Sequence, residues 1–163
     1  MVQSLQMKST PPPLSFRFLQ PARKIPQWMV WFLVHHPRFR LMLEQANTRV
    51  PAEMRRAQAA VRELGMMERM SALPVGMLIN ELVRGMPAEH AYVNVGVWKG
   101  FTLFAGMADN ADKICIGVDD FSQFNEKRFG KPREEFLAAF QDKKSPAHSF
   151  IETEYRTYLR TMH

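Results

Sequence analysis

The chain has 163 residues, which suits one domain, and its 46% of hydrophobic residues exclude a disordered chain. It holds a single cysteine, Cys115, so an intramolecular disulfide is excluded. The net charge of +6 comes from the N-terminal part, because residues 1–70 hold 11 Lys and Arg against 4 Asp and Glu, whereas residues 71–163 hold 11 against 12.

The first segment, residues 1–27, is expected to be irregular because its five spaced prolines cannot lie inside a regular helix. Residues 28–89 follow as a helical extension. Its first helix is expected over residues 28–45, with an interruption near Pro37. Its second helix begins at Pro51 and ends at Gly65. The apolar positions of this second helix recur at helical spacing and are Met54, Ala57, Val61 and Leu64.

The third helix of the extension is expected to begin after Ser71, whose hydroxyl can cap free backbone N–H groups. Pro74 lies near its start, and Gly85 with Pro87 ends it. Its apolar stripe predicts the buried face of the helix. That stripe consists of Val75, Leu78, Ile79 and Leu82.

The sequence WMVWFLVHHPRFR, residues 28–40, combines apolar and aromatic residues with basic ones. Packing on the rest of the protein is the expected role, and binding at a membrane surface is the alternative. Its apolar run is far shorter than the ~20 residues that span a membrane, and no targeting segment is evident. Because one cysteine, expected to be buried and inert, suits a reducing compartment, a cytoplasmic location is expected.

A nucleic-acid partner is not expected, although the N-terminal part is basic. Its arginines at 55, 56, 62 and 69 are typical of a solvated helix face. A metal site is not expected either, because His35, His36, His90 and His148 have no ligand partners at suitable spacing.

Residues 90–163 alternate between strands and helices. Strands are predicted over residues 91–95, 114–118 and 148–152. Helices are predicted over residues 101–108, from Pro132 onward, and over residues 155–162. This alternation is the pattern of an α/β fold with a Rossmann-like parallel sheet.

The turn after the first strand carries two glycines, Gly96 and Gly100, directly before a helix. Such a turn lies at the carboxyl end of a parallel strand, where open α/β sheets bind ligands. Asp119 ends the second strand 23 residues after Gly96, at the distance expected of a carboxylate that accepts the hydroxyl protons of a ribose. The pattern therefore predicts a site for a ribose-bearing cofactor.

The middle of the turn favours S-adenosylmethionine over a dinucleotide. A dinucleotide fingerprint needs glycine at positions 96, 98 and 101, and the chain has Gly96, Trp98 and Phe101. A tryptophan at the middle position would block the approach of a pyrophosphate. S-adenosylmethionine carries no pyrophosphate.

Residues 92–107, YVNVGVWKGFTLFAGM, and residues 113–124, KICIGVDDFSQF, resemble a class I S-adenosylmethionine-dependent methyltransferase. The similarity is to the group of macrolide sugar O-methyltransferases and their relatives, and it covers residues 72–163. It implies the first three strands of that family's seven-stranded sheet. It also implies transfer of a methyl group to a small-molecule acceptor.

The resemblance also implies roles for particular residues. Gly96, Val97 and Gly100 would hold the methionine end of the cofactor, Asp119 the ribose, and Glu154 would lie near the adenine. Many members carry an acid where this chain has Asn94, and an amide would contact the cofactor's ammonium group more weakly.

Two further residues of the candidate cofactor site follow Asp119 directly. Asp120 belongs to it, with a solvated loop acid as the alternative for both aspartates. Phe121, like Phe124, either flanks the adenine or packs in the core.

With only three strands, residues 91–95 are expected to form an exposed apolar edge. The chain is therefore expected to be a fragment of a longer enzyme, or to be completed by another subunit or by an oligomer through this edge. No catalytic residue is identified. The alternative function is a non-catalytic binding module with a Rossmann-like shape.

Overall fold

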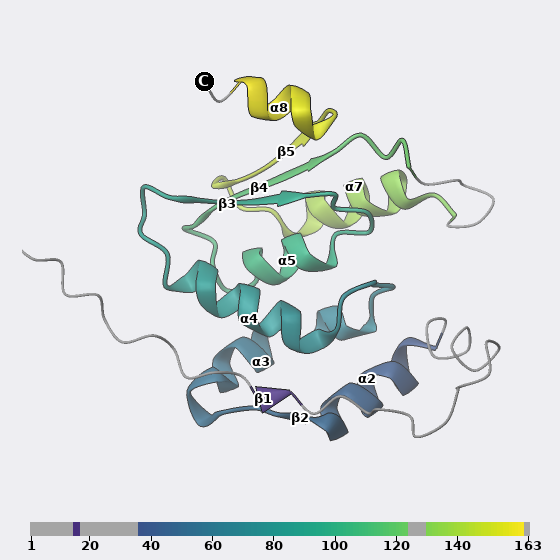
Figure 1. The fold of residues 1–163 in the computed structure, drawn as a ribbon, viewed down its shortest axis with the longest axis vertical. Coiled ribbons are helices and arrows are strands. Elements are labelled where there is room, and N and C mark those ends of the chain that lie inside the picture. Colours follow the sequence, from purple (N-terminus) through teal and green to yellow (C-terminus); the bar gives the residue numbers. More distant parts are fainter. Residues whose placement is uncertain (1–14, 17–35, 124–129, 162–163) are drawn as a thin grey trace, which may run out of the picture.

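A computed structural model describes residues 15–16, 36–123 and 130–161 (Figure 1). Most of the segment 1–27 and of the basic stretch 28–40 thus lies outside the described residues, as does Phe124. The elements in chain order are β1 (Ser15–Phe16), α2 (Pro37–Asn47), β2 (Thr48–Arg49), the 3-10 turn η1 (Ala52–Met54), α3 (Arg55–Val61), the 3-10 turn η2 (Glu63–Met66), α4 (Leu73–Arg84), β3 (Ala91–Val95), α5 (Phe101–Met107), β4 (Ile114–Asp119), α7 (Pro132–Lys143), β5 (His148–Glu152) and α8 (Tyr155–Thr161).

The sheet is parallel, as predicted, and its strands follow the order β3-β4-β5. Val95 lies opposite Val118, and Asp119 lies opposite Glu152, so the carboxyl ends of all three strands are level. In the described part of the chain β3 pairs with β4 alone, and the expected free edge is confirmed there. The fold is therefore of the α/β type.

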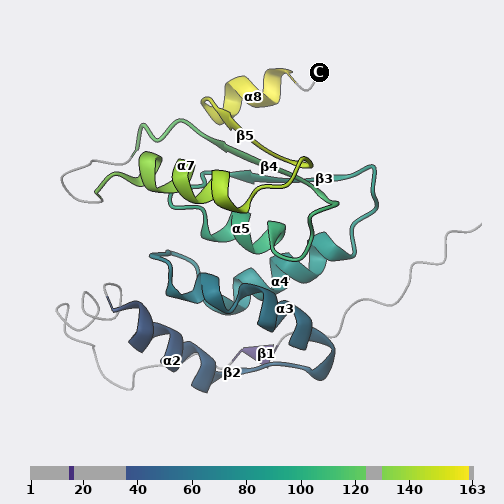
Figure 2. The same ribbon diagram turned by 180° about the vertical axis from the view of Figure 1, so that it is seen from behind.

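The elements stack in layers (Figures 1 and 2). Helices α5 and α7 cover one face of the sheet, α8 lies on the opposite face, and α4, α3 and α2 lie beyond α5. The layer between sheet and helices is aromatic: Phe104 stacks on Phe136 at 5.6 Å, and Phe136 meets Phe150 edge-on at 4.8 Å. Burial of these rings holds both helices on the sheet.

The predicted buried face of α4 is wrong at three of its four positions. Val75, Leu78 and Leu82 are 39%, 38% and 55% exposed, whereas Ile79 is partly buried against the core. The most buried residues of the helix lie on the opposite face. Gly76 decides the orientation, because a methyl group there would lie 2.8 Å from the ring of Phe101, so only glycine lets α4 approach α5 so closely. Asn80 then donates to the carbonyls of Ala105 and Ala108 at 2.8 and 2.7 Å.

The start of α4 also differs from the expectation. The residue before the helix is Ala72, and Ser71 does not cap it. Instead Glu44 of α2 accepts the N–H of Leu73 at 2.8 Å and pairs with the guanidinium of Arg69 at 2.7 Å. Burial opposes the charge on Glu44, but these hydrogen bonds outweigh it and lower the pKa of Glu44. A carboxylate from another helix thus replaces the local cap.

The rest of the helical extension agrees with the sequence in part. The four predicted apolar positions, Met54, Ala57, Val61 and Leu64, are buried, but the helix is divided into η1, α3 and η2. The predicted first helix begins, within the described residues, at Pro37. Two short strands were not expected: β1 lies in the proline-rich segment and pairs antiparallel with β2, which lies in the helical extension. No helix in residues 36–123 or 130–161 is long and apolar enough to cross a membrane.

Candidate functional site

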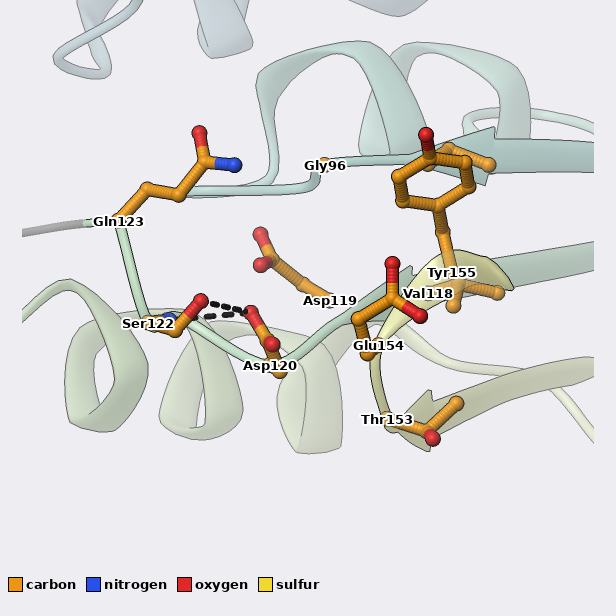
Figure 3. Close-up of a pocket in the computed structure, with 10 residues that line it drawn as sticks. Gly96, Val118, Asp119, Asp120, Ser122, Gln123, Thr153, Glu154 and Tyr155 are labelled. Atoms are coloured by element: carbon orange, nitrogen blue, oxygen red, sulfur yellow. Dashed lines mark hydrogen bonds between the residues drawn. The ribbon is translucent and has the colours of Figure 1, made fainter. Parts of the chain in front are cut away.

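A pocket of about 250 Å³ lies at the carboxyl ends of the three parallel strands (Figure 3). This is the edge at which open α/β sheets bind ligands. Its lining comes from the ends of β3 and β4, from the loops that follow β3, β4 and β5, and from the first residue of α8. The lining residues are Val95, Gly96, Val118, Asp119, Asp120, Ser122, Gln123, Thr153, Glu154 and Tyr155.

Gly96 forms the wall on the side of β3. Its φ of +77° lies in the left-handed region, and a methyl group built on it would meet no atom within 4 Å. The backbone is thus bare toward the pocket. The N–H of Gly96 continues the sheet by donating to the carbonyl of Val118 at 2.8 Å. The turn therefore offers a ligand open space beside a fixed backbone.

Asp119 holds the two loops that flank the pocket. One of its oxygens accepts the N–H of Trp98 and the other accepts the N–H of Phe121, both at 2.9 Å. Trp98 and Phe121 have φ of +49° and +55°, so each donor sits in a backbone conformation that is costly for its residue type. A carboxylate has about four acceptor positions, so two remain for ligand hydroxyls. In Figure 3 the carboxylate points from the end of β4 toward the backbone that follows Gly96, where Trp98 donates to it.

The other two acids of the pocket have local partners. Asp120 accepts the hydroxyl and the N–H of Ser122 at 2.7 and 3.0 Å, and these bonds lower the pKa of Asp120. Glu154 accepts the N–H of Thr157 at 3.1 Å at the start of α8, a favourable place for a negative charge. Among the lining residues that the structure describes, three are acids and none is a lysine, arginine or histidine. The described lining is therefore anionic.

The structure brings together four of the predicted site residues: Gly96, Asp119, Asp120 and Glu154. The other four predicted residues do not line the pocket; they are Asn94, Val97, Gly100 and Phe121. The lining also contains six residues that were not predicted: Val95, Val118, Ser122, Gln123, Thr153 and Tyr155. The rule that ligands bind at carboxyl strand ends could have indicated Thr153 and Tyr155, which directly follow β5.

Asn94 and Val97 face the helix layer. The side chain of Asn94 accepts from the Thr102 hydroxyl at 3.3 Å and donates to the Tyr92 hydroxyl at 3.1 Å, so its amide is used inside the protein. Val97 is 3% exposed in the core. Asn94 lies on the same face of β3 as Tyr92, because side chains two residues apart in a strand share one face of the sheet. That face is the one covered by α5.

Gly100 and Phe121 serve the aromatic core. Gly100 has a φ of +93°, and a methyl group there would overlap the ring of Phe104 and lie 2.9 Å from Phe136. Its missing side chain thus makes room for core rings. The ring of Phe121 is 8% exposed and lies 6.0 Å from that of Phe150. Of the two interpretations given for Phe121, the structure supports packing.

A larger hollow of about 620 Å³ lies at the other end of β5, beside His148. It is bounded by the ends of α5 and α7 and by the turn η2. Both ring nitrogens of His148 have partners: Nδ1 accepts the N–H of Ser145 at 3.0 Å, and Nε2 lies 3.2 Å from the carbonyl of Asn110. This hollow is remote from the carboxyl strand ends, so the smaller pocket is the candidate site.

Other reactive side chains play structural roles. Cys115 is fully buried, as predicted, and burial raises the pKa of its thiol to about 11, which keeps it protonated and inert. No three His, Cys, Asp or Glu gather as metal ligands within the described residues.

Neither a scan against models of known protein families nor a search of curated proteins finds a match to this chain. The function of this protein is therefore inferred from the geometry of the pocket and from the sequence motifs that form it.

Proposed function

We propose that this chain carries the cofactor-binding part of an S-adenosylmethionine-dependent methyltransferase with a Rossmann-like sheet. The observation that carries the proposal is the open turn at Gly96, which faces the carboxylate of Asp119 across a pocket at the carboxyl strand ends. The consecutive strands β3, β4 and β5, with α5 and α7 packed on one face, support the Rossmann-like class.

The charge of the pocket favours this cofactor over a dinucleotide. In the described part of the lining there are three carboxylates and no cationic side chain, so a pyrophosphate would meet repulsion from these residues without a partner among them. A sulfonium nucleoside carries a positive charge and a ribose diol. The carboxylates suit the charge, and the two free acceptor positions of Asp119 suit the diol.

When bound, the cofactor would supply an electrophilic methyl group. The chain's own residues hold and orient it. Gly96 leaves space beside the end of β3, and Asp119 orients the sugar while it fixes the loops at Trp98 and Phe121. The contribution of such a site is proximity and alignment with an acceptor. We propose an oxygen atom of a small molecule as that acceptor.

The free edge of β3 is the place where we propose that further structure completes the enzyme. The strand AYVNV carries no charge, and Val95 is 48% exposed, so the edge lacks the usual protection against pairing. A strand from another segment, another subunit or a second copy would pair there. It would bring acceptor-binding residues to the open side of the pocket.

The contacts of the lining acids suggest a second function. Each carboxylate of the described lining already accepts a hydrogen bond from the protein, so none is an unpartnered base that is held ready to take a proton from the methyl acceptor. This favours, as the alternative, a binding module that holds a nucleoside without catalysis.

Titration calorimetry tests the proposal. S-adenosylmethionine and its demethylated product should bind saturably and NAD should not. Asp119→Ala should weaken binding by at least about tenfold. The exposed acid Asp112 lies outside the pocket, so Asp112→Ala is the matched control and should bind as the wild type does. A folded sample that binds neither nucleoside would contradict the proposal.

If both nucleosides bind, the two functions are separated by methyl transfer from labelled cofactor to small hydroxylated acceptors. Transfer supports the enzyme, and binding with no transfer supports the binding module. A sample that includes any chain segment found to pair with β3 should be tested in parallel, because that segment would supply the acceptor side.

A further inference from the structure

Lys99 lies in the turn between Gly96 and Gly100, but its side chain contacts the opposite side of the turn from the pocket. Its ammonium group pairs with Glu68 at 2.7 Å and with Glu135 at 2.9 Å. Glu68 belongs to the loop between η2 and α4, and Glu135 belongs to α7. One side chain thus connects the turn to the helical extension and to the helix layer.

The Lys99 side chain is largely shielded from water, whereas the two carboxylates that pair with it are more exposed. The Lys99 side chain is 10% exposed, and that of Glu68 is 33% exposed. Burial opposes the charge on Lys99, but the hydrogen bonds to Glu68 and Glu135 outweigh it and raise the pKa of Lys99. Removal of one carboxylate would leave a buried charge with one partner, which is costly.

Arg69, the residue after Glu68 in the extension, contacts Phe101, where the turn ends and α5 begins. The guanidinium of Arg69 lies 5.1 Å from the centre of the Phe101 ring, at the first residue of α5. Arg69 is itself fixed by Glu44 of α2. The extension therefore contacts both ends of the segment from Lys99 to Phe101, which begins three residues after Gly96, a residue that lines the pocket.

We propose that Lys99 is a positioning residue for the pocket, and that Glu68 acts through it, so that the helical extension sets the conformation of the Gly96 turn and the affinity for its ligand. The identity of the ligand rests on the proposed function. The connection between the extension and the turn rests on the contacts of Lys99, together with that of Arg69 with Phe101, and does not depend on the ligand. Each arm of the test below addresses one of these.

The first arm needs no ligand. Glu68→Gln keeps the size of the side chain and removes its charge. Hydrogen exchange should become faster at the amides of Trp98 and Gly100, whose N–H groups donate to Asp119 and to the carbonyl of Val97. Amides in the middle of β4 should exchange as in the wild type.

The control for this arm is Val61→Ala. Val61 is fully buried in the extension, so the variant lowers overall stability without removing a contact of Lys99. If Glu68→Gln leaves exchange at the turn unchanged, or if Val61→Ala speeds it to the same extent, the connection is overturned.

The second arm measures the affinity for the demethylated cofactor product by calorimetry. Glu68→Gln should weaken binding about three- to tenfold. Glu135→Gln should have a smaller effect, because the Glu135 side chain is 52% exposed and its pairing is screened by water. Val61→Ala should leave affinity unchanged under conditions in which the protein stays folded.

A double-mutant comparison tests whether Glu68 acts through Lys99. In a Lys99→Met background, Glu68→Gln should add no further loss of affinity. An additive loss would overturn the role of Lys99. If the wild type binds no nucleoside, the proposed function fails, and the exchange arm alone decides whether the extension positions the turn.

Discussion

The Oδ2 atom of Asp119 accepts a hydrogen bond of 2.9 Å from the backbone N–H of Trp98, 21 residues earlier in the chain. This bond joins the end of β4 to the turn after β3. Because the other carboxylate oxygen accepts the N–H of Phe121, one side chain fixes both loops at the mouth of the pocket. Asp119 therefore serves the fold and the candidate site together.

Asp119→Ala should lower the free energy of unfolding by about 1–3 kcal/mol, since two backbone donors lose a charged acceptor. Asp119→Asn should cost less, because the amide oxygen can still accept one of the two hydrogen bonds. Denaturant unfolding of the three proteins measures the difference. Equal stability of all three would show that the two bonds do not hold the loops in solution.

The two glycines of the turn should respond differently to alanine. Gly96→Ala places a methyl group in the open pocket, so it should weaken ligand binding and cost only about 1–2 kcal/mol of stability for the left-handed backbone. Gly100→Ala adds overlap with Phe104 and Phe136 and should cost about 1–3 kcal/mol more. Thermal melting and calorimetry on both variants check the order. A Gly100→Ala protein as stable as Gly96→Ala would contradict the packing role of Gly100.

His148 should make the protein less stable in weak acid. Burial lowers the pKa of His148, and Nδ1 accepts the N–H of Ser145, so the neutral ring is the folded form. In the unfolded chain the ring titrates near a pKa of about 6.5. The stability it contributes is therefore full above that pH and is lost as pH falls through the lower pKa of the folded state.

Urea unfolding between about pH 5 and pH 7.5 measures this dependence. The free energy of unfolding of the wild type should fall toward acid, and that of His148→Gln should vary less over the same range. Exposed His90 provides the control, and His90→Gln should keep the slope of the wild type. A slope that survives in His148→Gln would assign the dependence to other groups.

Substitutions on the two faces of α4 should differ sharply in their effect on the free energy of unfolding. Leu82 is 55% exposed, so Leu82→Lys should change stability by less than about 0.5 kcal/mol. Met77 is 1% exposed on the opposite face, and Met77→Ala should cost about 2–5 kcal/mol. Denaturant unfolding measures both, and light scattering reports the molar mass. If Leu82→Lys is as costly as Met77→Ala and lowers the molar mass, a partner covers the outer face of α4 in solution.

Local patterns were sufficient for most of the elements in residues 90–161. Short segments between turn residues predicted β3 and β5 with their observed bounds, and Pro132 marked the first residue of α7. The same patterns predicted a parallel sheet, since strands and helices alternate. The pairing of Gly96 with Asp119 at one pocket also followed from the sequence, because parallel strands end at the same edge.

Long-range contacts decided what local patterns could not. The face of α4 was predicted incorrectly because the helix is apolar on two sides, and only the approach of Phe101 to Gly76 selects the buried one. The cap of the same helix comes from Glu44, 29 residues away, so no nearby residue could reveal it. Four predicted site residues lie in the segments that form the pocket but do not line it, because strand alternation and core packing place them on the other side; they are Asn94, Val97, Gly100 and Phe121.

The sequence alone determined which segments become strands and helices and that a glycine turn and an acid meet at one sheet edge, because periodicity and turn chemistry are local properties. Only the tertiary structure decided which side of each segment is buried and that Lys99 ties the turn to Glu68. Those choices depend on close contacts between residues far apart in the chain, where the space left by a missing side chain or the position of a single charge selects one arrangement.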